Sequence, residues 1–126
     1  MAYPNKVPTF DKYYTALITD ISSSTVAINS VQIPIWASGQ VVHVATCIST
    51  AITTGDATIT VSRNGTAITA AALTIANSSS AAGDIDSVDL ADGAFTVKKG
   101  DNILIASDGG STVVSSAGVL LVVREN

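Results

Sequence analysis

The amino-acid sequence predicts an all-β protein, an antiparallel β-sandwich or barrel built as one domain. Its 126 residues suit a single hydrophobic core. Ser, Thr, Val and Ile, which are mediocre helix formers, dominate the sequence, and no long segment has apolar residues at helical spacing. Short runs that alternate apolar and polar residues recur instead, with Gly, Asn, Asp and Ser between them, and this pattern is typical of antiparallel sheets.

The chain divides into an N-terminal arm, residues 1–14, and a sandwich domain, residues 15–126. Turn-forming residues separate ten alternating or apolar runs within the domain. We expect strands at residues 15–21, 25–28, 31–36, 40–50, 57–63, 66–76, 84–90, 94–98, 102–107 and 112–124.

The arm differs from the domain in composition. It holds four of the six aromatic residues and two of the three prolines. Proline keeps a segment extended and outside a sheet interior, and Tyr is enriched in binding hot spots. We expect the arm either to dock on a partner or to fold back over its own sandwich. The contact residues would be Tyr3, Pro4, Pro8, Phe10, Tyr13 and Tyr14.

The stretch ATITVSRNGTAI, residues 57–68, predicts a β-hairpin. Asn64-Gly65 between alternating residues favours a type I′ turn, which needs a positive φ at both central positions. In that register Val61 faces Ile68 on the core side. Asn64 and Asn77 both start a glycosylation triplet, but the N-terminus has no continuous apolar segment, so we expect no signal peptide and interpret both triplets as turns.

The residues that follow this hairpin predict a change of register. Leu73 and Ile75 have the wrong parity to share the core face of Val61 and Ile68. Because side chains alternate between the two faces of a strand, one extra residue moves all later side chains to the opposite face. We therefore expect a β-bulge within residues 70–72.

An acidic run, GDIDSVDLAD, occupies residues 83–92. Asp84, Asp86, Asp89 and Asp92 offer the hard oxygen ligands that Ca²⁺ prefers, but the run lacks the glycine and glutamate positions of an EF-hand loop. Asp84 and Asp86 alternate with Ile85, which predicts a strand with its carboxylates in water. We therefore expect no metal site here.

The last strand, AGVLLVV, is apolar without alternation. Val119, Leu121 and Val123 point to one side, and Leu120 and Val122 to the other. One face of a strand in a single sandwich usually meets water, and each exposed Val or Leu forgoes roughly 1.5–3 kcal/mol. We expect these five residues to form an interface with other copies of the chain. The alternative is a central strand in an unusually thick monomer core.

The reactive side chains are too few and too far apart for catalysis. The one histidine, His43, and the one cysteine, Cys47, share a strand face but stand about 13 Å apart at 3.3 Å per residue. They cannot supply the usual zinc ligands, so we interpret both as packing or interface residues. No nucleophile-elbow serine or phosphate-binding glycine pattern occurs. The sequence predicts no catalytic residue and no cofactor, and we do not expect an enzyme.

The composition limits the kinds of partner that the chain can bind. There are 6 Lys and Arg against 10 Asp and Glu, so the chain lacks the basic surface that binds nucleic acid. No apolar run approaches the roughly 18 residues of a membrane-spanning helix. Charged residues make up 13%, against about 25% in ordinary domains, and mean hydropathy is +0.44. The surface must therefore be covered by Ser and Thr, by other protein chains, or by both.

Several stretches carry a family resemblance. They are residues 31–41, 52–68, 73–87 and 97–105, together with the apolar last strand. Over residues 25–124 the chain resembles the head decoration, or cement, proteins of tailed bacteriophages. The resemblance implies a jelly-roll β-sandwich that binds the outer surface of a capsid as a homotrimer. The partner would be the major capsid protein, and the chain would be made in the host cytoplasm. The family offers no catalytic residues.

Two function classes therefore stand beside each other. The first is a structural capsid protein that cements the head shell. The second is a carbohydrate- or receptor-binding module of a phage fibre or a cell surface, because one fold serves many functions. Such a module would need an exposed aromatic platform, and the aromatic residues outside the arm are Trp36 and Phe95.

Overall fold

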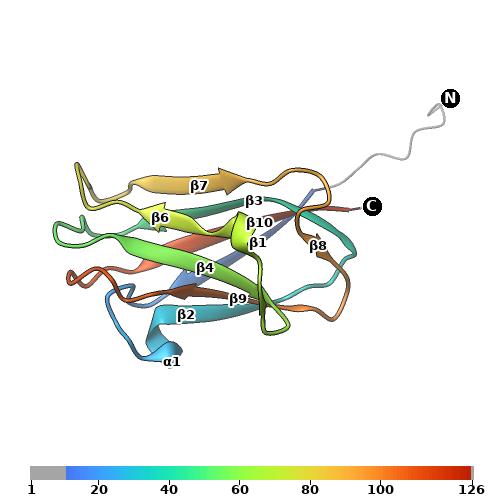
Figure 1. Cartoon of the computed structure of the whole chain (residues 1–126), viewed down its shortest axis with the longest axis horizontal. Coiled ribbons are helices and arrows are strands. Elements are labelled where there is room, and N and C mark those ends of the chain that lie inside the picture. Colours follow the sequence, from blue (N-terminus) through green and yellow to red (C-terminus); the bar gives the residue numbers. More distant parts are fainter. Residues whose placement is uncertain (1–10, 126) are drawn as a thin grey trace, which may run out of the picture.

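The computed structural model describes residues 11–125, which form two five-stranded antiparallel sheets packed against each other (Figure 1). Sheet A has the order β1-β10-β3-β7, with β8 beside β3, and sheet B has the order β2-β9-β4-β5, with β6 beside β4. The predicted all-β sandwich is confirmed. No helix within the described range is long and apolar enough to cross a membrane.

The elements of sheet A are β1 (Asp11–Ile18), β3 (Gly39–Ile48), β7 (Ile85–Asp89), β8 (Thr96–Val97) and β10 (Ala117–Glu125). The elements of sheet B are β2 (Ser30–Pro34), β4 (Ala57–Arg63), β5 (Thr66–Ala67), β6 (Leu73–Ile75) and β9 (Asn102–Ser107). A short helix α1 (Val26–Asn29) precedes β2, and a 3-10 turn η1 (Thr69–Ala71) separates β5 from β6.

The core lies between the two sheets and follows the alternation of the strands. In β4 and β9 every second residue is buried, as in Ile59 and Val61, and Ile103 and Ile105. Leu121 of β10 is buried among them from the side of sheet A. Burial of each such side chain stabilises the fold by roughly 1.5–3 kcal/mol, so these strands are held by side chains that the sequence pattern had placed inward.

The predicted hairpin is present between β4 and β5. Asn64 and Gly65 have φ values of 50° and 87°, as a type I′ turn requires, and the backbone N–H of Ile68 donates to the carbonyl of Val61 at 2.8 Å. The parity change expected after it is also present, since Leu73 pairs with Ile59 and is buried. A 3-10 turn of three residues makes the shift, in place of the predicted bulge.

One predicted strand is wrong, and another begins later than predicted. Residues 25–28 were expected to be extended, but Val26–Asn29 forms α1. The buried side chain of Asn29 donates to the carbonyls of Ser23, at 2.9 Å, and Ser107, at 3.1 Å, which holds this turn in place. Residues 112–116 form a loop before β10. Serine hydroxyls there bond to nearby backbone groups, such as Ser111 Oγ to the N–H of Val113, and compete with strand pairing.

The first strand begins earlier than predicted. β1 starts at Asp11 and pairs with β10 along its full length. Two ion pairs between these strands, Arg124 with Asp11 at 3.0 Å and Lys12 with Glu125 at 3.6 Å, lie at its start. Residues 11–14 of the predicted arm therefore belong to sheet A, and the boundary expected between residues 14 and 15 is wrong.

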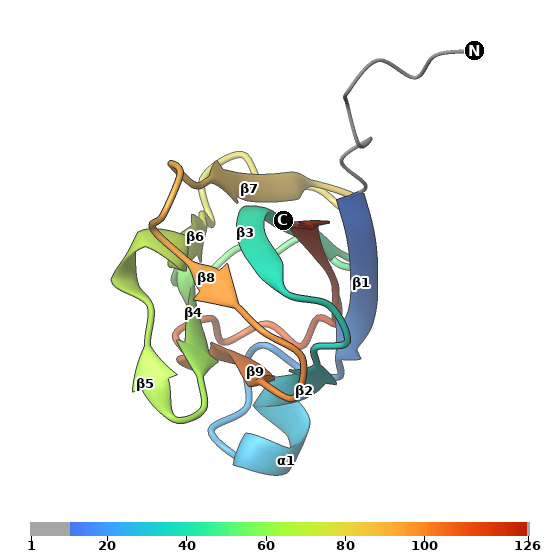
Figure 2. The same cartoon turned by 90° about the vertical axis from the view of Figure 1, so that its right-hand side faces the viewer.

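The strands run between two ends of the sandwich, which Figures 1 and 2 show from two directions. The proximal end, where β1 begins and β10 finishes, carries loops 35–38, 64–65, 90–95 and 98–101. The distal end carries loops 19–25, 49–56, 76–84 and 108–116. Backbone hydrogen bonds join the distal loops, for example Ile21 to Ser115 at 2.9 Å and Thr112 to Thr54 at 3.1 Å.

Candidate docking and assembly surfaces

The side chains of β10 divide between the core and the outer face of sheet A. Val119, Leu121 and Val123 are buried in the core of their own chain, so they are not available to a partner, and the predicted interface is wrong for these three residues. Leu120 is half-buried on the outer face. Val122 lies on that face too, but it is 6% exposed.

One row of residues on the outer face of sheet A is apolar across four strands. Leu17 of β1, Gly118 of β10, Cys47 of β3 and Ile85 of β7 lie in one row across the strands. Leu17 is 59% exposed and Ile85 is 71% exposed. Leu120 lies in the next row, beside Thr15 and Ala45. We call the surface formed by Leu17, Ala45, Cys47, Ile85 and Leu120 the apolar face.

A hollow of about 400 Å³ lies within the apolar face. Leu120, Ala45, Cys47 and Ile85 are among the residues that line it. Its floor includes Gly118, where the nearest atom to an added Cβ would be a carbonyl oxygen 3.9 Å away. The hollow therefore owes part of its space to the missing side chain at position 118.

The orientation of β7 is the reverse of the one predicted from its acidic run. Ile85 points outward, and Asp86 points to the core side, opposite Thr46. Burial, followed by the charge of Asp84, raises the pKa of the Asp86 carboxyl. The hydroxyl of Thr46 is buried without a hydrogen-bond partner among the described residues. Within residues 11–125, no group of three or more His, Cys, Asp or Glu side chains could hold a metal ion.

His43 and Cys47 both lie on the outer face of β3, as predicted, and do not contact each other. His43 Nδ1 is 2.6 Å from Asp89 Oδ1 at the edge of the sheet. Cys47 is an exposed free thiol whose Sγ donates to the carbonyl of Gly83 at 3.6 Å. Their interpretation as interface residues stays a prediction.

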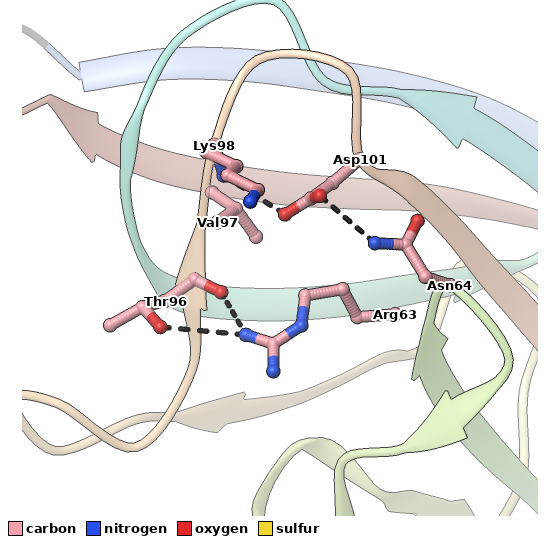
Figure 3. Close-up of a pocket in the computed structure, with 6 residues that line it drawn as sticks. All are labelled: Arg63, Asn64, Thr96, Val97, Lys98 and Asp101. Atoms are coloured by element: carbon pink, nitrogen blue, oxygen red, sulfur yellow. Dashed lines mark hydrogen bonds between the residues drawn. The ribbon is translucent and has the colours of Figure 1, made fainter.

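The proximal end contains a second concave site, a polar pocket of about 370 Å³ (Figure 3). Its buried polar member is Asp101. The side chain of Asn64 donates to Asp101 Oδ1 at 2.9 Å, and the backbone N–H of Lys98 donates to Oδ2 at 3.0 Å. These two bonds, with that from Asn64 the stronger, lower the pKa of Asp101. Asn64 in turn accepts from the N–H of Asn102 at 2.9 Å, so both ends of its amide are hydrogen-bonded.

Cationic side chains form the rim of this pocket. The guanidinium of Arg63 donates to the carbonyl and, at 3.4 Å, to the hydroxyl of Thr96 (Figure 3). Lys98 lines the pocket and is exposed. The sequence interpretation missed this pocket, because Asn64-Gly65 and the KKGD turn of residues 98–101 were both recognised only as turns. The polar side chains of these two turns, among them Asn64, Lys98 and Asp101, are the sequence feature that could have indicated a polar pocket.

An exposed aromatic residue, Trp36, lies beside the loop that carries Lys99. Trp36 is 70% exposed, and Lys99 Nζ lies 5.2 Å from the centre of its ring. The backbone N–H of Trp36 donates to the hydroxyl of Tyr14 at 3.2 Å. Phe95, the other aromatic residue considered for a binding platform, is buried in the core and cannot serve as one.

The predicted docking arm is only partly within the structure. Tyr3, Pro4, Pro8 and Phe10 lie outside the described residues. Tyr13 and Tyr14 lie in β1, and the side chain of Tyr13 is exposed next to Val122.

Comparison with known proteins shows the fold. No family model and no curated protein matches the chain. Among solved structures, a chain of the cyanophage Pam1 capsid asymmetric unit has a TM-score of 0.59 at 17% identity, covering 100% of this chain and 93% of that one. A Clostridium stercorarium carbohydrate-binding module in complex with cellobiose has a TM-score of 0.44 at 14% identity, covering 77% and 66%. Another such module, in complex with calcium and xylotriose, has a TM-score of 0.46 at 14% identity, covering 94% and 100%.

Proposed function

We propose that this chain is a structural protein of a bacteriophage virion, which binds the outer surface of the head shell as a homotrimer and stabilises it. The observation that carries the proposal is the apolar face, a broad surface that a single copy leaves in water. The likeness of the fold to a chain of a phage capsid supports the same assignment.

The strand order supports jelly-roll connectivity as part of this proposal. The strands pair in a nested series, β1 with β10, β2 with β9, β3 with β7 and β4 with β6. The first strand therefore meets the last, and successive inner pairs alternate between sheets A and B. A long hairpin wound into two sheets has this pattern, which is that of the jelly roll.

The apolar face is the proposed contact between copies. Leu17, Ile85 and Leu120 project from three different strands of one sheet, so they form a surface rather than isolated exposed side chains. Exposed contiguous apolar patches mark interaction sites. Another copy presents the same chemistry, and closed symmetric assemblies of one chain are the commonest oligomers.

Stabilisation of the shell follows from mass action. A protein that binds assembled capsid subunits, and not separated ones, shifts the equilibrium toward the intact shell. In a trimer three arms act together, so weak contacts made by each arm give tight attachment. The arm, with Tyr3, Pro4, Pro8 and Phe10 outside the described residues, is the proposed capsid-docking segment. No step of this role needs catalysis, a cofactor or a metal ion.

A carbohydrate- or receptor-binding role is the second candidate. One specific observation favours it, the exposed ring of Trp36 beside the polar pocket, because aromatic faces and polar side chains together can bind sugars. A glycan array would test this role. Binding that disappears in Trp36→Ala favours it over cementing, and an array without binding removes it.

The cementing role is tested with head shells of the same phage assembled without this chain. Purified protein is added, the shells are sedimented, and bound protein and heat resistance are measured. We expect saturable binding and a higher disruption temperature. Shells that acquire neither bound protein nor heat resistance contradict the proposed function.

A further inference from the structure

The cationic side chains of the domain are confined to one end of the sandwich. The chain has six Lys and Arg residues, of which one, Lys6, lies outside the described residues. The other five all lie at the proximal end, at the start of β1, the end of β4, the loop after β8 and the end of β10. They are Lys12, Arg63, Lys98, Lys99 and Arg124.

The distal end carries negative charges without cations. Its four loops carry four aspartates and no Lys, Arg or His. Each carboxylate accepts a hydrogen bond from a backbone N–H, as Asp56 does from Asn77 at 2.9 Å and Asp108 from Gly110 at 2.8 Å. Such bonds do not remove the negative charge. The two ends therefore differ in potential, and the molecule has an electric dipole along its strands.

Not all proximal cations are free to meet a partner. Arg124 pairs with Asp11, and Lys12 with Glu125. In contrast, the ion pairs within residues 11–125 do not include Arg63, Lys98 or Lys99. The nearby carboxylate of Asp101 is buried and accepts hydrogen bonds from Asn64 and Lys98. The proximal end as a whole also carries five carboxylates, which balance its five cations: Asp11, Asp89, Asp92, Asp101 and Glu125. The excess of positive charge is therefore local, at Arg63 and Lys98 in the pocket and at Lys99 beside Trp36.

We infer that the proximal end, around Arg63, Lys98, Lys99 and Trp36, is the surface that meets the head shell, and that it fits a shell surface bearing carboxylate side chains. This inference rests on the proposed function. The guanidinium of Arg63 and the ammonium groups of the two lysines recognise carboxylates, and Trp36 supplies apolar contact area beside them. β1 begins at this same end of the sandwich (Figure 2).

The geometry of the sandwich makes this docking compatible with self-association. The apolar face runs along the strands, whereas the proximal end lies where the strands finish. Copies can therefore pack side by side through the apolar face while all of them turn the proximal end to the shell. The acidic distal end then points away from the shell, and its repulsion from similar ends keeps decorated heads apart.

Matched charge changes at the two ends test the inference. Lys98→Gln/Lys99→Gln removes two positive charges from the proximal end, and Thr53→Asp/Thr54→Asp adds two negative charges to exposed positions at the distal end. Both variants change the net charge equally. Binding of each to undecorated shells of the same phage is measured by sedimentation from low to high salt.

We expect the proximal variant to bind about tenfold more weakly at low salt, or about 1.4 kcal/mol. Its salt dependence should be smaller, because it loses two exposed charges that salt screens. The distal variant should bind like the original chain. Loss of binding in the distal variant alone, equal loss in both, or no loss in the proximal variant overturns the inference. Failure of the original chain to bind contradicts the proposed function itself, so the two failures are distinguishable.

A carbodiimide cross-linker gives an independent readout, since it joins amines directly to carboxylates. On decorated shells we expect links from Lys98 or Lys99 to shell carboxylates, identified by mass spectrometry. Links from distal aspartates, such as Asp56 or Asp108, to shell lysines would place the opposite end on the shell.

Discussion

Leu120 and Leu121 are neighbours in β10 whose side chains lie on opposite faces of sheet A. Leu121 is 0% exposed and packs in the core, whereas Leu120 lines the hollow in the apolar face. The last strand is apolar on both sides, and each side has its own role. One side packs in the core of the sandwich, and the other is available to another chain. This relationship separates the stability of the sandwich from its association.

Truncation of the two leucines should therefore have different effects. Leu121→Ala removes buried methyl groups and leaves a cavity, so the free energy of unfolding should fall by about 2–5 kcal/mol. Leu120→Ala should lower it by less, since the side chain is half-buried. Urea titration of both variants at high dilution measures the difference. Equal losses would contradict the assignment of the two faces.

The hairpin turn should depend on the glycine at position 65. Gly65 has a φ of 87°, and no atom lies within 4 Å of an added Cβ. The cost of Gly65→Ala is thus purely conformational, about 1–2 kcal/mol. Thr66→Ala is the control, because it changes the next exposed position of the same hairpin and leaves the two residues with positive φ in place. Thermal unfolding should show a lower midpoint for the first variant only.

Acid stability should depend on Asp101. Its carboxyl has a lowered pKa in the folded state, through Asn64 and the N–H of Lys98. Its contribution to stability is therefore complete above the unfolded pKa of about 3.9 and is lost as the pH falls through the folded value. Asp101→Asn should lower the free energy of unfolding at pH 7 by about 1–3 kcal/mol and flatten its decline below about pH 4.

The pKa of Asp86 is shifted in the opposite direction to that of Asp101. Burial raises its pKa, so its contribution to stability is present below the unfolded pKa and is lost as the pH rises through the folded value. Asp86→Asn should make the protein more stable at pH 7. The free energy of unfolding of each variant is measured against pH. A curve for Asp101→Asn parallel to that of the original chain would contradict the lowered pKa of Asp101. A loss of stability at pH 7 in Asp86→Asn would contradict the raised pKa of Asp86.

The single cysteine reports on association. Cys47 is exposed on the apolar face in one copy, and a second copy packed there would cover it. A thiol reagent should label it quickly at high dilution and several-fold more slowly at high concentration. A labelling rate independent of protein concentration would mean that this face stays open.

The sequence predicts the parts of the fold that depend on alternation. β4 and β9 occur at the predicted residues 57–63 and 102–107 because their side chains alternate between core and surface without interruption. The Asn64-Gly65 turn is equally local, since only residues that tolerate positive φ occupy it. These elements need no knowledge of the rest of the chain.

Other features depend on distant residues and could not be found locally. α1 forms because Asn29 bonds to Ser107, which is far along the sequence. Ile85 and Asp86 could face either way by pattern, and pairing with Cys47 and Thr46 decides the direction. The polar pocket and the separation of charges likewise arise when the topology brings Arg63 beside the loop of Lys98.

The mass in solution of the original chain and of Leu120→Asp, measured by sedimentation equilibrium across a wide concentration range, tests the central claim most directly. One chain has a mass of 12.7 kDa. We predict that the original chain sediments with three times that mass and that Leu120→Asp sediments as a folded single chain. An original chain that remains a single copy at every concentration, or a Leu120→Asp variant that still assembles, would contradict it.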